Sequence, residues 1–307
     1  MKRKDIILLF INIFLLIFLI FGICFRKGNS NLKTTKTALL NPKYKNSIEK
    51  IEISTKKYDI LLEKYNKFQM SYFVSYLNLK NYDNNYDIKY DNFIKMFPNG
   101  LNSDKNVIIE LLENMTKLVY VGKIDAKTAK TSDFYFENSI KIFVSSEPVL
   151  DLSFSLPDAS YSRCFIKNNK TGDIYVAEDS YSRYFELNAT DFLNKNFFPE
   201  EFAQNKNLVS SITLSDKRGN SSRTLTAKSK DFDKTLSRLV SLRSSQIVDF
   251  SEWDSVLSLQ SSYDVIFESV SGKKYPLSIY QQGSDNYCFA QGILYKISEW
   301  TLERIVE

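Results

Sequence analysis

The chain has 307 residues, a formal net charge of +5 and 25% charged residues, and its basic and acidic side chains are interleaved. This charge is too weak and too diffuse for a nucleic-acid surface, so we expect no nucleic-acid partner. The chain contains no histidine, which excludes Ser-His and Cys-His catalytic systems and zinc sites with imidazole ligands.

The first predicted element is a membrane-spanning helix from Ile6 to Phe25. Asn12 is the only polar side chain in this run of 20 residues, and basic residues flank the run on both sides. About 20 apolar residues span a hydrocarbon core of ~30 Å. Bulky residues continue to the charged edge, unlike the cleavage site of a signal peptide. Cleavage and lipid attachment at Cys24 are the alternatives, although Ile23 stands where a lipoprotein signal normally needs a small residue.

The orientation of this segment is weakly encoded. Three Lys or Arg residues precede the segment, and four follow it up to and including Lys36. The positive-inside rule therefore gives almost no preference for either orientation. A short basic tip before an apolar run is typical of an uncleaved signal anchor. We therefore expect residues 1–27 to form a single-pass anchor in the inner (cytoplasmic) membrane. A polar tether at residues 28–46 would then lead to a soluble body outside the cytoplasm.

Residues 47–206 predict a first α+β unit. Ile48, Ile51 and Ile53 indicate an opening strand, and alternating apolar positions follow. A helix is predicted after Ser103, its expected N-cap, because apolar residues recur there at helical spacing through residue 118. Further strands are expected near residues 118–121, 140–144, 150–154, 163–166 and 174–177, and then a short helix from Thr190 that stops at Pro199.

Residues 207–307 repeat this order in shorter form. Val209, Ile212 and Leu214 reproduce the spacing of the first strand, and a hairpin around Gly219 leads to a helix with apolar spacing over residues 232–243. Ser229 or Asp231 is the expected cap, and more strands follow. We therefore predict an α+β fold in two related halves, each an antiparallel hairpin-rich sheet with one main covering helix.

Little in the sequence indicates chemistry. Cys164 and Cys288 fall at equivalent places in the two halves, which favours two buried thiols over a disulfide. Glycine-rich phosphate loops are absent from the sequence. Paired carboxylates such as Glu200 and Glu201 are typical of a solvated helix face, and no local pattern selects a Ser-Lys pair. We predict a non-enzymatic protein with no cofactor and no catalytic, cofactor-binding or metal-binding residues.

Four segments carry a family resemblance: the strand at residues 47–54, the helix at residues 107–118, the Ile-Tyr-Val strand at residues 174–176, and the charged and apolar run at residues 191–198. In these segments the chain resembles the domain of unknown function 4340 family. It departs from the family pattern at Leu193, where an arginine is expected, and no tryptophan follows the first hairpin. The likeness covers most of the chain after residue 40.

The resemblance implies a role and no catalytic residues. It implies an extracytoplasmic auxiliary component that works through protein contacts beside the permease and ATPase of a gliding-motility-type ABC transporter, with another anchored envelope protein. The alternative is a module that binds envelope glycan or peptide, because exposed aromatic rings stack on sugars and anchor interfaces. The chain has 19 tyrosines, although tyrosine is also common between strands, and several are clustered at Tyr72, Tyr76, Tyr82, Tyr86 and Tyr90.

Overall fold

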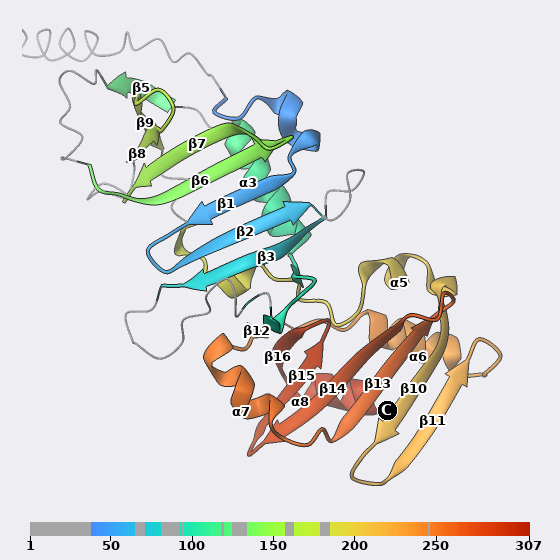
Figure 1. Ribbon diagram of the computed structural model, residues 1–307. Helices are drawn as coiled ribbons and strands as arrows, with labels where there is room; N and C mark the ends of the chain where they lie inside the picture. Colours follow the sequence, from blue (N-terminus) through green and yellow to red (C-terminus); the bar gives the residue numbers. More distant parts are fainter. Residues whose placement is uncertain are drawn as a thin grey trace, which may run out of the picture.

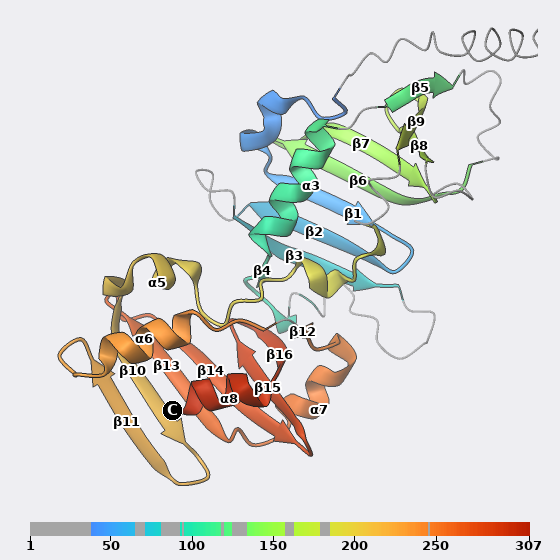
Figure 2. The same ribbon diagram turned by 180° about the vertical axis from the view of Figure 1, so that it is seen from behind.

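The computed structural model describes residues 38–64, 71–80, 93, 95–117, 120–124, 134–156, 163–178, 185–244 and 246–307. Two antiparallel sheets with a few helices give an α+β fold (Figures 1 and 2). The predicted membrane segment at residues 6–25 lies outside the described residues, and within them no helix is long and apolar enough to cross a bilayer.

The first sheet has nine strands in the order β4-β3-β2-β1-β6-β7-β8-β9-β5. Its strands alternate in burial: Ile51 and Ile53 of β1 face the core, whereas Lys50 and Glu52 face away. The strands are β1 (Lys50–Ser54), β2 (Tyr58–Lys64), β3 (Tyr72–Leu79), β4 (Leu101–Asn102), β5 (Tyr120–Ile124), β6 (Phe136–Val144), β7 (Glu147–Ser155), β8 (Arg163–Asn168) and β9 (Ile174–Glu178).

Helix α3 (Lys105–Lys117) covers this sheet on one face (Figure 2). Its apolar stripe is buried as predicted, at Ile108, Leu111, Leu112 and Met115. The prediction of Ser103 as N-cap was wrong by one residue. The Asp104 carboxylate accepts the backbone N–H of Asn106 at 2.9 Å, whereas the Ser103 hydroxyl donates to the carbonyl of Tyr72 at 2.6 Å.

The end of the predicted tether packs against the same helix. A 3-10 turn, η1 (Pro42–Ser47), begins after Asn41, and Lys45 Nζ lies 3.0 Å from Glu113 Oε1. Leu40 is 1% exposed, and its backbone N–H donates to the carbonyl of Met115 at 3.2 Å. The chain therefore joins the body at the C-terminal end of α3.

The second sheet has seven strands in the order β11-β10-β13-β14-β15-β16-β12. Helix α6 (Phe232–Val240) and a second helix, α8 (Glu299–Val306), lie over one face (Figure 2). The sequence pattern missed α8, so this sheet has two covering helices instead of one. The strands are β10 (Val209–Asp216), β11 (Ser221–Thr226), β12 (Gln246–Ile247), β13 (Tyr263–Ser269), β14 (Lys274–Gln282), β15 (Asp285–Ala290) and β16 (Ile293–Ile297).

The two sheets have the same strand order once β3 and β4 are set aside. The first then reads β2-β1-β6-β7-β8-β9-β5, and the second reads β11-β10-β13-β14-β15-β16-β12. In both, the strand that follows the helix in sequence lies at the far edge of the sheet. Cys164 on β8 and Cys288 on β15 occupy corresponding strands, and both side chains are buried. The two cysteines therefore lie in different sheets, and no disulfide joins them.

Candidate functional site

A single stretch of chain, residues 188–198, joins the two sheets, and we call it the seam. Near its start, the carbonyl of Phe192 accepts the backbone N–H of Asp104 beside β4 at 2.7 Å. Further along, the carbonyl of Lys195 accepts the N–H of Ser244, beside β12, at 3.0 Å. The seam thus forms backbone hydrogen bonds with an edge of each sheet.

Aromatic side chains anchor the seam on both sides. The ring of Phe192 lies edge-on to Tyr58 of β2, with centroids 6.2 Å apart. The ring of Phe198 stacks on Phe267 of β13, with centroids 3.8 Å apart. All four rings are at least 97% buried. Because buried aromatic side chains contribute several kcal/mol each, these contacts fix the seam to both sheets.

Tyr295 of β16 supports the middle of the seam. Its hydroxyl donates to the carbonyl of Asn194 at 2.9 Å and lies 3.3 Å from that of Asn196. Its ring packs edge-on against Phe197 with centroids 5.1 Å apart. Burial raises the pKa of the Tyr295 phenol well above its usual value, so the hydroxyl keeps its proton and acts as a donor.

These contacts explain why the predicted helix from Thr190 to Pro199 was wrong. Only a short turn forms, η3 (Ala189–Phe192). Leu193 then bridges to Ser103 in β-fashion, so the backbone is extended. Pro199 comes before a helix instead of ending one, since α5 (Glu200–Gln204) begins directly after it, as proline geometry allows.

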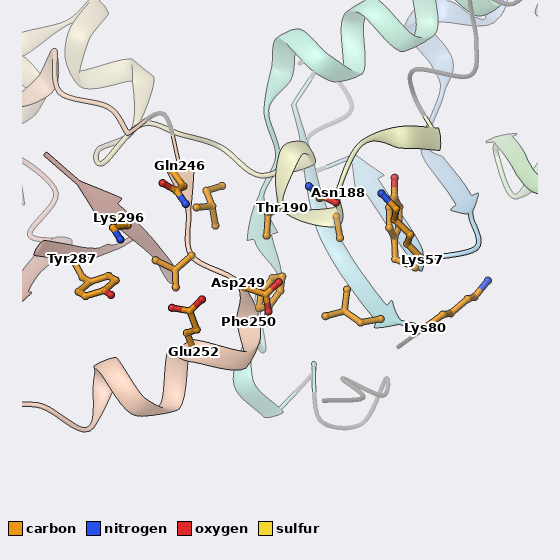
Figure 3. A pocket seen from close by; sticks show the side chains of 15 residues that line it. Lys57, Lys80, Asn188, Thr190, Gln246, Asp249, Phe250, Glu252, Tyr287 and Lys296 are labelled. Carbon is orange, nitrogen blue, oxygen red and sulfur yellow. The ribbon is translucent and has the colours of Figure 1, made fainter. Parts of the chain in front are cut away.

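A cleft of about 550 Å³ lies beside the seam, between the two sheets (Figure 3). Its volume falls within the range of about 300–1,000 Å³ that is typical of small-molecule sites, and such sites often lie between domains. Three parts of the chain line it: Lys57, Tyr58, Leu79 and Lys80 from the first sheet, Asn188, Ala189 and Thr190 from the seam, and Gln246, Ile247, Val248, Asp249, Phe250, Glu252, Tyr287 and Lys296 from the second sheet.

The side of the cleft formed by the first sheet carries two lysines at the end of the β2–β3 hairpin. The backbone N–H of Lys80 donates to the carbonyl of Lys57 at 2.7 Å. The ammonium of Lys80 is neutralised by Asp59, at 2.6 Å. The Lys57 ammonium is exposed and lies 3.4 Å from the carbonyl of Glu186. It forms no ion pair within the described residues.

The opposite side carries the acidic groups (Figure 3). Asp249 accepts the N–H of Ser251 at 3.0 Å as a cap, and Glu252 follows it; within the described chain neither carboxylate forms an ion pair. Lys296 is compensated by Asp285, at 2.8 Å. That contact lowers the pKa of the Asp285 carboxyl and raises the pKa of Lys296. The charge of Glu252 also contributes to the raised pKa of Lys296. With Asp249, Glu252 and Asp285 against Lys296, the second side still has a net negative charge, whereas Lys57 gives the first side a positive charge.

A second cleft of about 520 Å³ contacts the seam at residues 194–196 and shares Lys296 with the first. Arg243 and Lys195 give it positive charge, and Asp104 and Glu200 give it negative charge. Its groups are already engaged in part, since the Asn196 side chain donates to Glu200 Oε1 at 3.2 Å. Within the described residues no group of three or more Cys, Asp or Glu side chains is placed to hold a metal ion.

The clefts were not visible in the sequence, which predicted no site residues. Of the tyrosine cluster, Tyr72 is a core residue, 4% exposed, whose hydroxyl donates to the carbonyl of Ile48 at 3.1 Å. Tyr82, Tyr86 and Tyr90 lie outside the described residues. A lysine at a hairpin end and an acidic pair after a two-residue strand give no periodic signal, so only the fold brings them together.

A comparison with protein families shows one match. The model described as Domain of unknown function (DUF4340) matches residues 97–261, more than half of the chain. The matched range contains α3, the seam and α6. Among curated proteins, none matches the sequence.

Proposed function

The chain belongs to the DUF4340 family, and we propose that it is a membrane-anchored, non-catalytic auxiliary subunit of an ABC-type transport complex that acts through protein contacts. The observation that carries the proposal is the family match over residues 97–261. The family resemblance adds the partners: an ABC permease, its ATPase and another anchored envelope protein. Residues 191–198, which carry part of that resemblance, belong to the seam and pack against both sheets. Their role in this body is architectural.

The proposed location is the inner (cytoplasmic) membrane, with residues 6–25 as a single span and the body outside the cytoplasm. The apolar run and its basic flanks support it. Because Leu40 is fixed on α3, only residues 28–39 are left as tether. Twelve residues reach at most about 40 Å when fully extended. The first sheet is therefore the part of the body nearest the membrane and nearest to a permease.

We also propose that the two sheets with their helices are an internal repeat, with residues 47–206 and 207–307 as its units. The shared strand order supports this, as do the corresponding positions of Cys164 and Cys288. Chance similarity of two meander sheets is the competing explanation. A repeat requires that the first strand of each unit has corresponding neighbours. This is observed, because β1 pairs with β2 and β6, and β10 pairs with β11 and β13.

The direct test is crosslinking in native membranes, followed by affinity capture and mass spectrometry. The tag should follow Glu307 on a flexible linker, because Arg238 Nη1 pairs with the Glu307 carboxylate at 3.2 Å and Arg223 donates to the Glu307 carbonyl at 2.6 Å. An unrelated single-pass protein with the same tag is the control. Capture of a permease and an ATPase in constant stoichiometry is expected; capture of the chain alone would reject the proposal.

The second candidate is a module that binds envelope peptide or glycan, and the cleft beside the seam favours it. The cleft lies between two sheets, a common place for ligand sites, and its lining is rich in polar and charged side chains that suit a polar ligand. Recovery of envelope fragments without transporter subunits would support this candidate. Substitution of Tyr82, Tyr86 and Tyr90 by alanine tests whether the protein binds glycan through these rings. Unchanged capture of envelope glycan by the variant would show that they do not contact it.

A further inference from the structure

The cleft beside the seam has charges of opposite sign on opposite sides that do not neutralise each other. Lys57 is on the side of the first sheet, and Asp249 and Glu252 are on the side of the second (Figure 3). None of the three forms an ion pair in the part of the chain that the structure describes. A ligand that carries one positive and one negative group satisfies both sides at once.

The neighbouring lysines do not compete for such a ligand. The Lys80 ammonium is held by Asp59 and also donates to the Ser54 hydroxyl at 2.9 Å. The Lys296 ammonium is held by Asp285. Among the residues that the structure describes, Lys57 is therefore the cation of this cleft that is left for an incoming anion.

The wall between the charged ends suits an extended peptide. Strand β12 (Gln246–Ile247) ends the second sheet and, among the described strands, pairs only with β16. Its edge is only partly open, because the Ser244 hydroxyl accepts the backbone N–H of Gln246 at 3.1 Å and donates to the Gln246 carbonyl at 2.9 Å. Peptides commonly add to such a strand edge through main-chain hydrogen bonds. The Gln246 and Asn188 amides and the Thr190 hydroxyl supply further donors and acceptors, and the half-buried Leu79 and Ile247 supply apolar surface.

We infer that this cleft binds a short peptide with free ends, its carboxylate at Lys57 and its amine at Asp249 and Glu252. A neutral glycan would gain no charge-assisted contact between opposite charges at these three exposed side chains, which makes it the poorer fit. The inference does not rest on the transporter role, because peptide binding is a property of the chain alone. A failure here leaves the captured permease and ATPase unaffected, so the two proposals fail separately.

The test uses the full chain in detergent micelles, immobilised and incubated with a pool of random tetrapeptides with free ends. Retained peptides are identified by mass spectrometry. Two further pools carry either an acetylated amine or an amidated carboxylate. Each cap removes one charge-assisted contact worth about 1.5–3 kcal/mol, so retention should fall at least about tenfold for each.

Substitutions locate the two ends. Lys57→Gln should remove the preference for a free carboxylate and keep the preference for a free amine. The double variant Asp249→Asn and Glu252→Gln should do the reverse; asparagine still caps the turn. Lys228→Gln and Glu303→Gln, at exposed positions outside the cleft, are the matched charge controls and should leave both preferences intact. Circular dichroism of every variant checks the fold.

Three results would overturn the inference. Equal retention of the free and capped peptide pools would show that the protein does not recognise the charged ends of the peptide. Persistence of both preferences in the cleft variants would place the binding elsewhere. Retention of a neutral oligosaccharide pool, with no peptide retained, would assign the cleft to glycan.

Discussion

Two buried tyrosines provide a matched test of what holds the seam. Tyr295 is 0% exposed and Tyr58 is 1% exposed. The Tyr295 hydroxyl donates to the carbonyl of Asn194 at 2.9 Å, whereas the Tyr58 hydroxyl has no hydrogen-bond partner among the described residues. Burial raises the pKa of both phenols, with a further contribution from the charge of Asp191 at Tyr58. Replacement of either residue by phenylalanine removes one oxygen and keeps the ring.

The two substitutions should change the free energy of unfolding in different directions. A hydrogen bond contributes about 0.5–1.5 kcal/mol net, and a buried acceptor left without a donor costs about 1–3 kcal/mol. Tyr295→Phe should therefore destabilise the protein by about 1–2 kcal/mol. A hydroxyl buried without a partner already costs about 1–3 kcal/mol in proteins. Tyr58→Phe removes that cost and should therefore stabilise the fold, by up to about 1–3 kcal/mol.

The measurement is urea unfolding of the full chain in detergent, monitored by tryptophan fluorescence. Of the two tryptophans, Trp253 is 1% exposed and should report unfolding, whereas Trp300 is already 59% exposed in the folded protein. Hydrogen exchange provides the local readout. The amide of Ser244 donates to the seam carbonyl of Lys195, so it should exchange faster in Tyr295→Phe and unchanged in Tyr58→Phe. Equal losses of stability in the two variants would refute the role assigned to the Tyr295 hydroxyl.

Two further predictions concern glycines with positive φ and the ion pair between Lys45 and Glu113. Gly100→Ala should lower the free energy of unfolding by more than about 2 kcal/mol, because φ is +68° and a Cβ would collide with the ring of Phe73. Gly272→Ala is the control: φ is +80° but the space is open, so the loss should be only about 1 kcal/mol. A larger loss for Gly272→Ala than for Gly100→Ala in denaturant unfolding would contradict this. A hydrogen bond from Lys45, followed by the charge of Lys45, holds the pKa of Glu113 below its usual 4.5. Lys45→Met should raise the pKa of Glu113 in an NMR titration. A carboxyl pKa that is lower in the folded than in the unfolded state stabilises the fold at a pH above the unfolded-state pKa. The stability difference between wild type and variant should therefore vanish as the pH falls through the folded-state pKa of Glu113.

The sheets could be predicted because half-buried strands and amphipathic helices have a period. Ile51 and Ile53 alternate with Lys50 and Glu52, and each pair faces one side of β1. The α+β class and the antiparallel pairing follow from such patterns. Helix α8 was missed because its eight residues give only two turns of periodic signal at the end of a strand-rich region.

The seam shows where local signals fail. Thr190 and Pro199 suggested a helix, yet the backbone between them pairs with an edge of each sheet. Leu193 forms a β-bridge with Ser103, and Asn196 forms one with Arg243. Ser103, a good N-cap by its residue type, instead donates to Tyr72 across the sheet. Tertiary hydrogen bonds outweighed intrinsic preferences of a few tenths of a kcal/mol to about 1 kcal/mol.

The cleft depends on both sheets at once. Lys57 comes from the first sheet and Glu252 from the second, and the seam residues between them are held by Phe192 on one side and Phe198 on the other. A single sheet with its helix would carry only one of the two charges and no wall opposite it. If the two sheets arose as a repeat, the first unit alone could have made protein contacts, but the cleft could form only after the second unit docked. Loss of seam packing should therefore abolish peptide binding before it unfolds either sheet, which separates a binding role from a purely structural one.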